Sequence, residues 1–361
     1  MRTIAVANQK GGCGKTTTAV NLAAALAEQQ QNVLLMDLDP QAHATIGFGH
    51  DPDDLPQTLY EAVTSPYVKL TDVLLPTTME RLTLAPASVI LASADVELSR
   101  AAHRELILSN VLGSVRDRYD VCVMDCAPSF GILTISALVA SSDIIVPVQP
   151  HYYSVEGLRR VLETVRLIRE RFQRGSAGNL NVLLTLVEDR TTLSKQIQSQ
   201  MRGIFGSLVF QTVIHNNVRL CEAPSAGESI LQYAPQSRGA LEYRALAAEV
   251  LGRAPMAEAV GVSSSRRGIQ KDLSEIFGGL HPRSTPTPSH EAQTRSGMAT
   301  GIACNDGGKP SNELDGAGVG QAGAEPQGDL DLEHEAAALS AAYNPASAGR
   351  SSSPQESETS P

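Results

Sequence analysis

The chain has 361 residues, of which 42% are hydrophobic, only 4% are aromatic and none is tryptophan, and its formal net charge is −10. Residues 255–361 hold 14 of the 39 acidic residues but only 7 of the 29 basic ones. This balance excludes a uniformly basic nucleic-acid-binding protein and leaves room for a local basic patch. No apolar run reaches the roughly 18 to 20 residues that span a bilayer, and the polar N-terminus is unlike a signal peptide. Five cysteines without metal-ligand spacing predict a reduced, cytosolic chain.

Up to about residue 254, short apolar runs alternate with longer helical patterns. The runs are rich in Val, Ile and Leu, which is typical of parallel strands buried on both faces. We expect strands at residues 3–7, 32–37, 82–85, 121–125, 144–148, 181–187 and 208–213. We expect helices at residues 16–29, 100–118, 154–171, 194–205 and 239–251. This order predicts a doubly wound, mostly parallel α/β domain over residues 1–254, with its ligand site at the carboxyl ends of the strands.

The amino-acid composition changes after Arg253. Residues 255–281 are interpreted as a linker, in which apolar residues at helical spacing over 266–280 predict a short amphipathic helix. Residues 282–361 are rich in Pro, Ser, Gly and acidic residues. Such a segment buries too little apolar area to offset its chain entropy, so we expect a disordered acidic tail.

The strongest motif is the glycine-rich run KGGCGKTT at residues 10–17, which lies between a predicted strand and a predicted helix. Its backbone N–H groups can turn around phosphates, and the following helix N-terminus favours negative charge. Lys15 can reach the β- and γ-phosphates, and the Thr16 hydroxyl can ligate Mg²⁺. Lys10 stands where the ordinary motif needs no cation. It is placed to reach a nucleotide across a dimer interface.

With this second lysine, the loop resembles the deviant Walker loop of the ParA/MinD ATPases. The resemblance is greatest to the ParA/Soj branch, the chromosome and plasmid partition ATPases without an N-terminal DNA-binding domain. It covers nearly all of residues 1–251 in the right order. The further matching segments are 33–41 (VLLMDLDPQ), 121–129 (VCVMDCAPS), 146–158 (VPVQPHYYSVEGL), 184–191 (LTLVEDRT), 216–227 (NNVRLCEAPSAG) and 237–239 (SRG).

The resemblance implies an ATPase with ATP and Mg²⁺ as cofactors, and it assigns roles residue by residue. The implied catalytic residues are Lys10, Lys15 and Asp39, of which Asp39 positions the attacking water. The implied magnesium ligands are Thr16 and Asp125, the latter through a metal-bound water. Asp37, two positions earlier, ranks below Asp39 as a catalytic candidate and is interpreted as a switch-region or structural acid. The implied ATP-binding residues are Lys10, Gly11, Gly12, Cys13, Gly14, Lys15, Thr16, Thr17 and Asn217.

The resemblance also implies an ATP-dependent homodimer that binds nonspecific DNA in the cytoplasm, on the nucleoid, and that meets a ParB-like centromere-binding partner. Arg219 and Arg238 match the family's DNA-binding positions, although each can equally form a structural ion pair. Two cations that are common in the family are absent here, near residues 215–216 and at Glu228. Two alternatives stay open: a MinD-like ATPase that binds membranes through residues 266–280, and an orphan relative that positions a cargo other than DNA.

Overall fold

The computed structural model describes residues 1–151, 154–172 and 179–252. The expected amphipathic helix at 266–280 and the expected tail at 282–361 lie outside the described residues.

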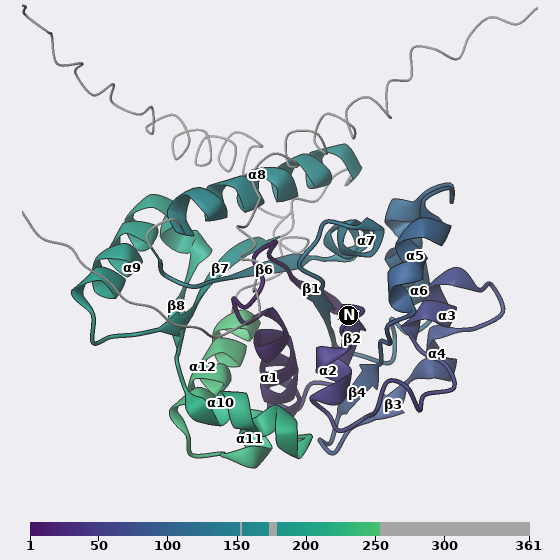
Figure 1. Ribbon diagram of the computed structural model, residues 1–361, viewed down its shortest axis with the longest axis horizontal. Helices are drawn as coiled ribbons and strands as arrows, with labels where there is room; N and C mark the ends of the chain where they lie inside the picture. The colour runs from purple at the N-terminus through teal and green to yellow at the C-terminus, as the bar shows by residue number, and fades with distance from the viewer. Residues whose placement is uncertain (152–153, 173–178, 253–361) are drawn as a thin grey trace, which may run out of the picture. The chain divides into compact units, whose positions relative to one another are not determined.

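Within the described ranges, eight strands form one sheet in the order β3-β4-β2-β5-β1-β6-β7-β8 (Figure 1). Neighbouring strands pair in parallel, except that β3 is antiparallel to β4. The strands are β1 (Arg2–Val6), β2 (Val33–Leu38), β3 (Leu75–Pro76), β4 (Leu82–Ala85), β5 (Val121–Cys126), β6 (Asp143–Val148), β7 (Asn179–Val187) and β8 (Val209–His215). The predicted fold class, a doubly wound and mostly parallel α/β sheet, is confirmed.

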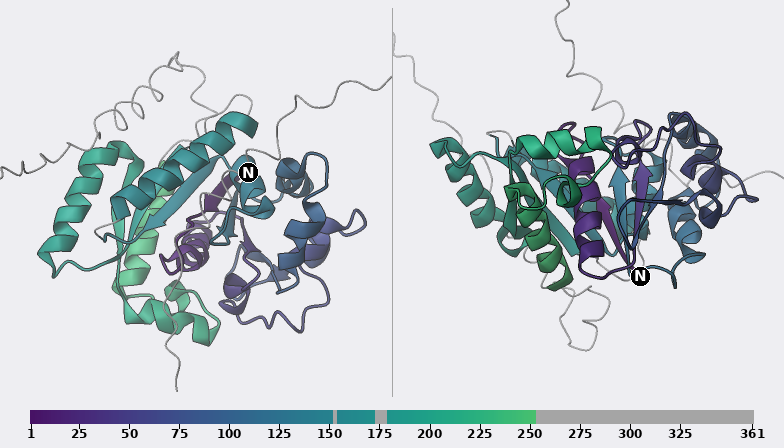
Figure 2. Two further views of the ribbon diagram at one scale, coloured as in Figure 1. Left: turned by 45° about the horizontal axis from the view of Figure 1, so that its top comes forward. Right: turned by 90° about the horizontal axis from the view of Figure 1, so that it is seen from below.

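Helices cover both faces of this sheet (Figures 1 and 2). One face packs against α3 (Leu59–Thr64), α4 (Leu70–Val73), α5 (Leu91–Leu98), α6 (Ile107–Gly113), α7 (Ile132–Ala140), α8 (Ser154–Phe172) and α9 (Thr192–Phe205). The other packs against α1 (Lys15–Glu28), α2 (His43–Ile46), α10 (Val218–Glu222), α11 (Ile230–Tyr233) and α12 (Arg238–Gly252). Three short 3₁₀ turns complete the described elements: Arg104–Leu106, Gly206–Leu208 and Ala223–Ala226.

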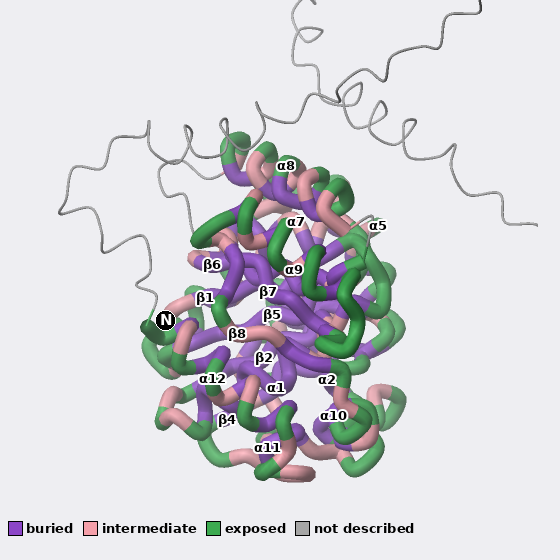
Figure 3. Tube along the Cα trace, turned by 90° about the vertical axis from the view of Figure 1, so that its left-hand side faces the viewer, coloured by how far each residue is buried: buried purple, intermediate pink, exposed green. Residues whose placement is uncertain are grey.

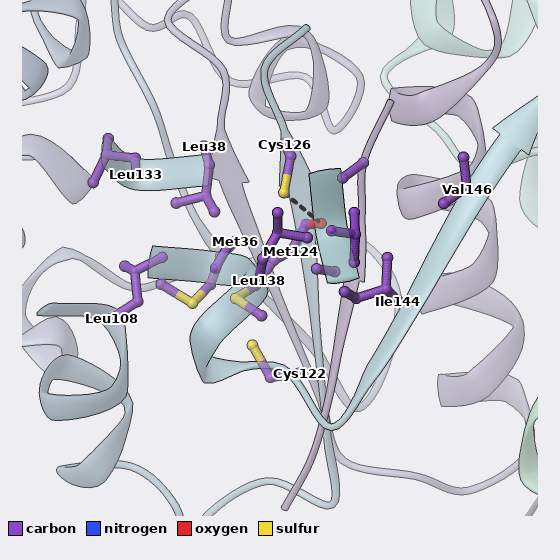
Figure 4. Close-up of a cluster of buried hydrophobic side chains, with 14 of the residues drawn as sticks. Met36, Leu38, Leu108, Cys122, Met124, Cys126, Leu133, Leu138, Ile144 and Val146 are labelled. Carbon is purple, nitrogen blue, oxygen red and sulfur yellow. Dashed lines mark hydrogen bonds between the residues drawn. The ribbon is translucent and has the colours of Figure 1, made fainter. Parts of the chain in front are cut away.

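The alternation of side chains along β5 shows how the two faces are separated. Cys122, Met124 and Cys126 point into the core beneath α7, among Met36, Leu138 and other apolar side chains (Figure 4). Val121 and Val123 point to the opposite face and pack with α1. Because successive strand residues alternate, Asp125 shares the α1 face. All six residues of β5 are buried, and Figure 3 shows buried strands between helices with exposed outer surfaces.

One arginine ties the amino end of β1 to its neighbours. The Arg2 guanidinium forms a two-pronged ion pair with Asp143 on β6, at 2.7 and 2.9 Å, and also donates to the Val250 carbonyl oxygen on α12. Burial raises the pKa of the Asp143 carboxyl, but the hydrogen bonds and charge of Arg2, together with hydrogen bonds from Asn179 and Ser142, outweigh it and leave that pKa below its usual value. These contacts tie β1 to the neighbouring strand β6 and to α12, at the end of the sheet away from the glycine-rich loop.

The expected helix at residues 100–118 is wrong in its extent. His103 has a φ of +56°, which is outside the right-handed helical region and ends any continuous helix there. A 3₁₀ turn at Arg104–Leu106 then leads into α6, which ends at Gly113. The apolar spacing in this stretch therefore belongs to one short helix and not to a single long one.

Candidate nucleotide site

The loop between β1 and α1 depends on two glycines. Gly12 and Gly14 have φ values of +68° and +85°, a left-handed conformation that glycine adopts at no steric cost. Gly14 is the N-cap of α1, so residues 11–14 lead the chain directly into the helix N-terminus. The loop residues Gly11 and Gly12 are exposed, and nothing lies within 4 Å of where a β-carbon would stand on either. This arrangement leaves backbone N–H groups open to an anion.

The two lysines of the loop are placed differently. Lys15 is buried, with 7% of its surface exposed, and its Nζ donates to the Lys10 carbonyl oxygen at 3.2 Å. Lys10 itself is exposed. The Cys13 thiol is fully buried beneath the loop and donates to the same Lys10 carbonyl. Burial raises the pKa of Cys13 despite the opposing charges of Lys15 and Lys10, so the thiol is a small packing group and not an ionised nucleophile.

Two polar residues that sequence reasoning missed fix the ends of the loop. Asn8 donates from its amide to the Pro147 carbonyl oxygen at 2.7 Å and accepts from the Lys10 N–H at 3.1 Å. Thr185 on β7 donates to the Cys13 carbonyl oxygen at 2.8 Å. Thr185 is a polar residue within a buried apolar strand, and this was the one available signal. The contact between Asn8 and Pro147 links distant segments, which leaves no local pattern in the sequence.

Two aspartates face α1 from neighbouring strands. Asp37 on β2 and Asp125 on β5 are register partners, and both are fully buried. Asp37 accepts hydrogen bonds from the N–H and hydroxyl of Thr45 and from the Asp39 N–H. Neither oxygen of Asp125 has a hydrogen-bond partner within the residues that the structure describes. Asp125 is therefore a buried carboxylate with both oxygens available to a ligand.

The pKa values of this pair reflect that difference. Burial raises the pKa of Asp37 to about 6, although its hydrogen bonds with Thr45 and Asp39 act in the opposite direction. Burial also raises the pKa of Asp125 well above its usual value, and the neighbouring charge of Asp37 raises it further. The nearby Thr16 hydroxyl, although it forms no hydrogen bond with either oxygen at normal distance, and the Lys15 charge lower that pKa in part. A cation at Asp125 would offset most of the free-energy cost of ionising this buried carboxyl, because an opposite charge favours the ionised form.

These residues fit Mg²⁺. Magnesium is bound in proteins through one or two carboxylates together with substrate phosphates and waters, and not through a dedicated protein cage. Thr16 at the start of α1 and the unpartnered Asp125 supply such a partial set. No group of three or more acidic, His or Cys residues that could enclose a metal occurs in residues 1–151, 154–172 and 179–252.

Asp39 follows directly after β2, at the same edge of the sheet. It is 8% exposed, and its Oδ1 accepts from the Gln41 N–H at 2.9 Å. Its backbone oxygen accepts from the Ala42 N–H, also at 2.9 Å. No described residue hydrogen-bonds its Oδ2, which leaves one carboxylate oxygen able to orient a water.

Comparisons with known proteins bear on the identity of this site. Residues 1–177 match the sequence family described as an AAA domain. The chain is 44% identical over 247 residues to the sporulation initiation inhibitor protein Soj of Bacillus subtilis, a match covering 68% of this chain and 97% of Soj. It is 38% identical over 255 residues to the chromosome partitioning protein ParA of Myxococcus xanthus, covering 70% of this chain and 88% of that protein. The chain belongs to the ParA/Soj family.

Family membership establishes the chain as a partitioning ATPase that uses ATP and Mg²⁺. A crystal structure of cobyrinic acid a,c-diamide synthase from Mycobacterium smegmatis, with a bound ATP analogue and magnesium, has the same fold. It is 35% identical, with a TM-score of 0.61, and the match covers 71% of this chain and 98% of that one. The predicted ParA/Soj resemblance, the ATPase activity and both cofactors are thereby confirmed. No helix in the described part of this ParA/Soj protein is long and apolar enough to cross a bilayer.

The remaining site predictions for this ParA/Soj protein lie beyond β8. Asn217 is the N-cap of α10, where its Oδ1 accepts from the Arg219 N–H at 2.9 Å. This leaves its amide nitrogen as the group that can contact a base. The Arg219 side chain is 59% exposed and pairs with Glu222 at 2.9 Å.

Arg238, at the start of α12, lies in a larger charged cluster. It pairs with Glu242 at 2.8 Å and with Asp189 at 3.2 Å, and its guanidinium also contacts the His215 ring. His215 in turn contacts both carboxylates. The Arg238 side chain nevertheless remains 57% exposed.

Proposed function

We propose that this ParA/Soj protein is an ATP-dependent dimerising switch for DNA partition. The dimer binds nonspecific DNA, and partner-stimulated hydrolysis returns it to a released monomer. The observation that carries the proposal is the convergence, at one edge of the sheet, of a glycine loop with Lys15, an unpartnered Asp125 and Asp39. Family membership supports the same function.

In the proposed reaction, the loop residues Gly11 to Gly14 hold the phosphates through backbone N–H groups, and Lys15 adds its charge at the β- and γ-phosphates. Thr17 supports the α-phosphate. Thr16 and Asp125 hold the magnesium, which neutralises charge that develops on the phosphates during transfer. The free oxygen of Asp39 orients the attacking water and accepts its proton.

Lys10 is proposed to act on the partner's nucleotide. Its backbone carbonyl is occupied by Lys15 and Cys13 within the same loop, whereas the residue itself is exposed. A cation supplied across an interface lowers the barrier of phosphoryl transfer, and its contact with the partner's nucleotide makes dimerisation depend on bound nucleotide. Lys10→Ala should therefore bind ATP as a monomer and fail to dimerise, as measured by light scattering after size exclusion with Mg²⁺–ATP.

Arg219 and Arg238 are proposed to contact DNA phosphates. Each forms ion pairs with acidic side chains, but exposed pairs contribute only about 0–1 kcal/mol and are screened by salt, so a polyphosphate can compete for the guanidinium groups. Few arginines and the absence of two family cations favour weak, salt-sensitive binding. We expect the protein in the cytoplasm on the nucleoid, with a ParB-like protein as the partner that stimulates hydrolysis.

Fluorescence anisotropy of a nonspecific duplex tests the DNA step. The wild-type protein should bind with Mg²⁺–ATP and not with Mg²⁺–ADP, and the affinity should fall as salt rises. Arg219→Ala/Arg238→Ala should weaken binding and lower the slope of log affinity against log salt by the equivalent of about two phosphate contacts. Arg116→Ala/Arg118→Ala is the matched control, since it removes two exposed arginines from the segment before β5, at the amino end of the sheet. Equal loss of binding in both double variants would contradict the assignment.

A further inference from the structure

The segment that carries Asp39 is closed into a short loop by one buried carboxylate. The Asp37 Oδ1 accepts from the Asp39 N–H at 3.2 Å, while its Oδ2 accepts from the Thr45 N–H at 2.9 Å. Residues 39 and 45, the two ends of the segment, are thus tied to the same side chain. Asp37 is engaged within this segment through both of its oxygens and is unlike Asp125 in that respect.

Thr45 extends this arrangement to the next strand. Its hydroxyl donates to the Asp37 Oδ2 at 2.8 Å and accepts from the Ala87 N–H at 3.0 Å, just beyond β4. The residue is completely buried on α2. A single hydroxyl therefore links the carboxyl end of β2, the helix α2 and the carboxyl end of β4.

The segment between these ties is strained. Ala42 has a φ of +52°, a left-handed conformation that is unfavourable for a residue with a β-carbon. It is 2% exposed, and its N–H is bonded to the Asp39 carbonyl oxygen. Such a conformation persists only where the surrounding structure holds it. The Thr45 contacts close the far end of this turn, together with the Ile46 N–H, which donates to the Ala42 carbonyl oxygen at 2.9 Å.

We propose that Thr45 is a positioning residue for ATP hydrolysis: through Asp37 and Ala87 it holds the strained turn that places the Asp39 carboxylate. This inference rests on the proposed role of Asp39 as the water-orienting group. We assign Thr45 no contact with the nucleotide, because it is completely buried and its hydroxyl bonds to Asp37 and Ala87. Its removal should change the rate of hydrolysis and leave ATP affinity in place, because the phosphate loop is fixed separately by Asn8 and Thr185.

Three substitutions of Thr45 test the proposal by steady-state ATP hydrolysis, fluorescent-nucleotide binding and thermal unfolding. Thr45→Val keeps the shape and removes the hydroxyl. Its turnover should fall about 10- to 100-fold, with ATP affinity within about threefold of wild type, since a small misplacement of a reacting group costs that much. Thr45→Ser keeps the hydroxyl and should restore most of the turnover. The turnover of Thr45→Cys should lie between those two, because its thiol is a weak donor. This variant replaces Thr45→Val in the test if Thr45→Val does not fold.

Thr3→Val is the matched control. The Thr3 hydroxyl also donates to an oxygen and accepts from a backbone N–H, those of Ala140 and Ser142, both at 2.9 Å, but at the amino end of the sheet. Its loss should lower the unfolding temperature and leave turnover per folded molecule unchanged. An equal loss of turnover in Thr3→Val would show a general effect of destabilisation and overturn the proposal.

Asp39→Ala in the same assays separates the role of Thr45 from that of Asp39. If Thr45→Val hydrolyses ATP at the normal rate while Asp39→Ala is inactive, the proposed role of Thr45 is overturned and that of Asp39 stands. Normal turnover in Asp39→Ala would instead remove the proposed hydrolytic role of Asp39, and the inference with it.

Discussion

Asp37 and Asp125 stand opposite one another on neighbouring strands, and both are fully buried, yet only Asp37 is hydrogen-bonded within the described part of the chain. The folded protein therefore binds a proton at this pair more tightly than the unfolded chain does. The stability that the proton contributes is fully present below the usual pKa of 3.8 and is lost as pH rises through the Asp37 pKa of about 6. Asp125 acts in the same direction.

Asp125→Asn should stabilise the nucleotide-free protein, because a neutral amide avoids the cost of an ionised, unpaired carboxylate. At pH 7 in EDTA we expect a gain on the order of 2 kcal/mol in the free energy of unfolding, shrinking toward pH 4. Urea unfolding at several pH values measures it. Asp143→Asn is the matched control and should lose about 3 kcal/mol, since it leaves Arg2 without its buried partner. A loss of stability in both variants at pH 7 would contradict the role given to Asp125.

The same substitution should weaken the effect of magnesium. In the wild-type protein, Mg²⁺ should raise the affinity for ATP strongly, whereas Asp125→Asn should show a much smaller difference between Mg²⁺ and EDTA. If the variant is more stable without nucleotide and its ATP affinity depends less on Mg²⁺, the Asp125 carboxylate serves to bind the metal at a cost in stability. The two readouts together separate a metal site from a structural acid.

Lys15→Ala should lower ATP affinity by about 100-fold or more, because it removes the buried charge that we propose to donate hydrogen bonds to the phosphates. Equilibrium binding of a fluorescent ATP analogue measures the change. Lys195→Ala removes an equal charge from an exposed position on α9 and should bind the analogue like wild type. Comparable weakening by both variants would mean that only the net charge matters.

Gly227→Ala should destabilise the fold by about 2–4 kcal/mol, the sum of left-handed strain and overpacking. Gly227 has a φ of +68°, and a β-carbon there would stand 3.0 Å from the Cα of Gly49. Gly12→Ala shares the positive φ, also at +68°, but meets nothing within 4 Å. Its loss should be only about 1 kcal/mol, from the strain alone. Equal losses by urea unfolding would show that the contact between the two loops contributes nothing.

Seven of the eight described strands were predictable because they are runs of apolar residues that are largely buried, whereas the two-residue edge strand β3 was missed. The expected strand at 121–125 became β5 over Val121–Cys126, with its two cysteines in the core. The helix over 100–118 was not predictable in its true form, because the break depends on the left-handed backbone of His103. The short elements α2 to α4 were missed because four to six residues are too few to show a helical period.

The parts of the candidate site that lie within short sequence motifs were predictable. The glycine loop, Lys15 and the carboxylates Asp39 and Asp125 follow apolar strands in sequence, where parallel topology brings them to one edge. The roles of Thr45 and Thr185 were not predictable, because each acts through a hydrogen bond to a segment more than forty residues away. Nor could the sequence decide between the two readings of Arg219 and Arg238, since both pairing and exposure are features of the folded surface.

The proposed DNA-partition switch is tested most sharply by sedimentation of purified Asp39→Ala protein with Mg²⁺–ATP, against nonspecific duplex DNA and against anionic liposomes, at two salt concentrations. We expect a stable dimer that binds DNA, more weakly at high salt, and stays bound because it cannot turn over ATP. Binding to liposomes alone would contradict the DNA-partition function and favour a membrane-associated relative. Binding to neither would favour a cargo other than DNA, and normal ATP turnover would remove Asp39 from the hydrolytic step.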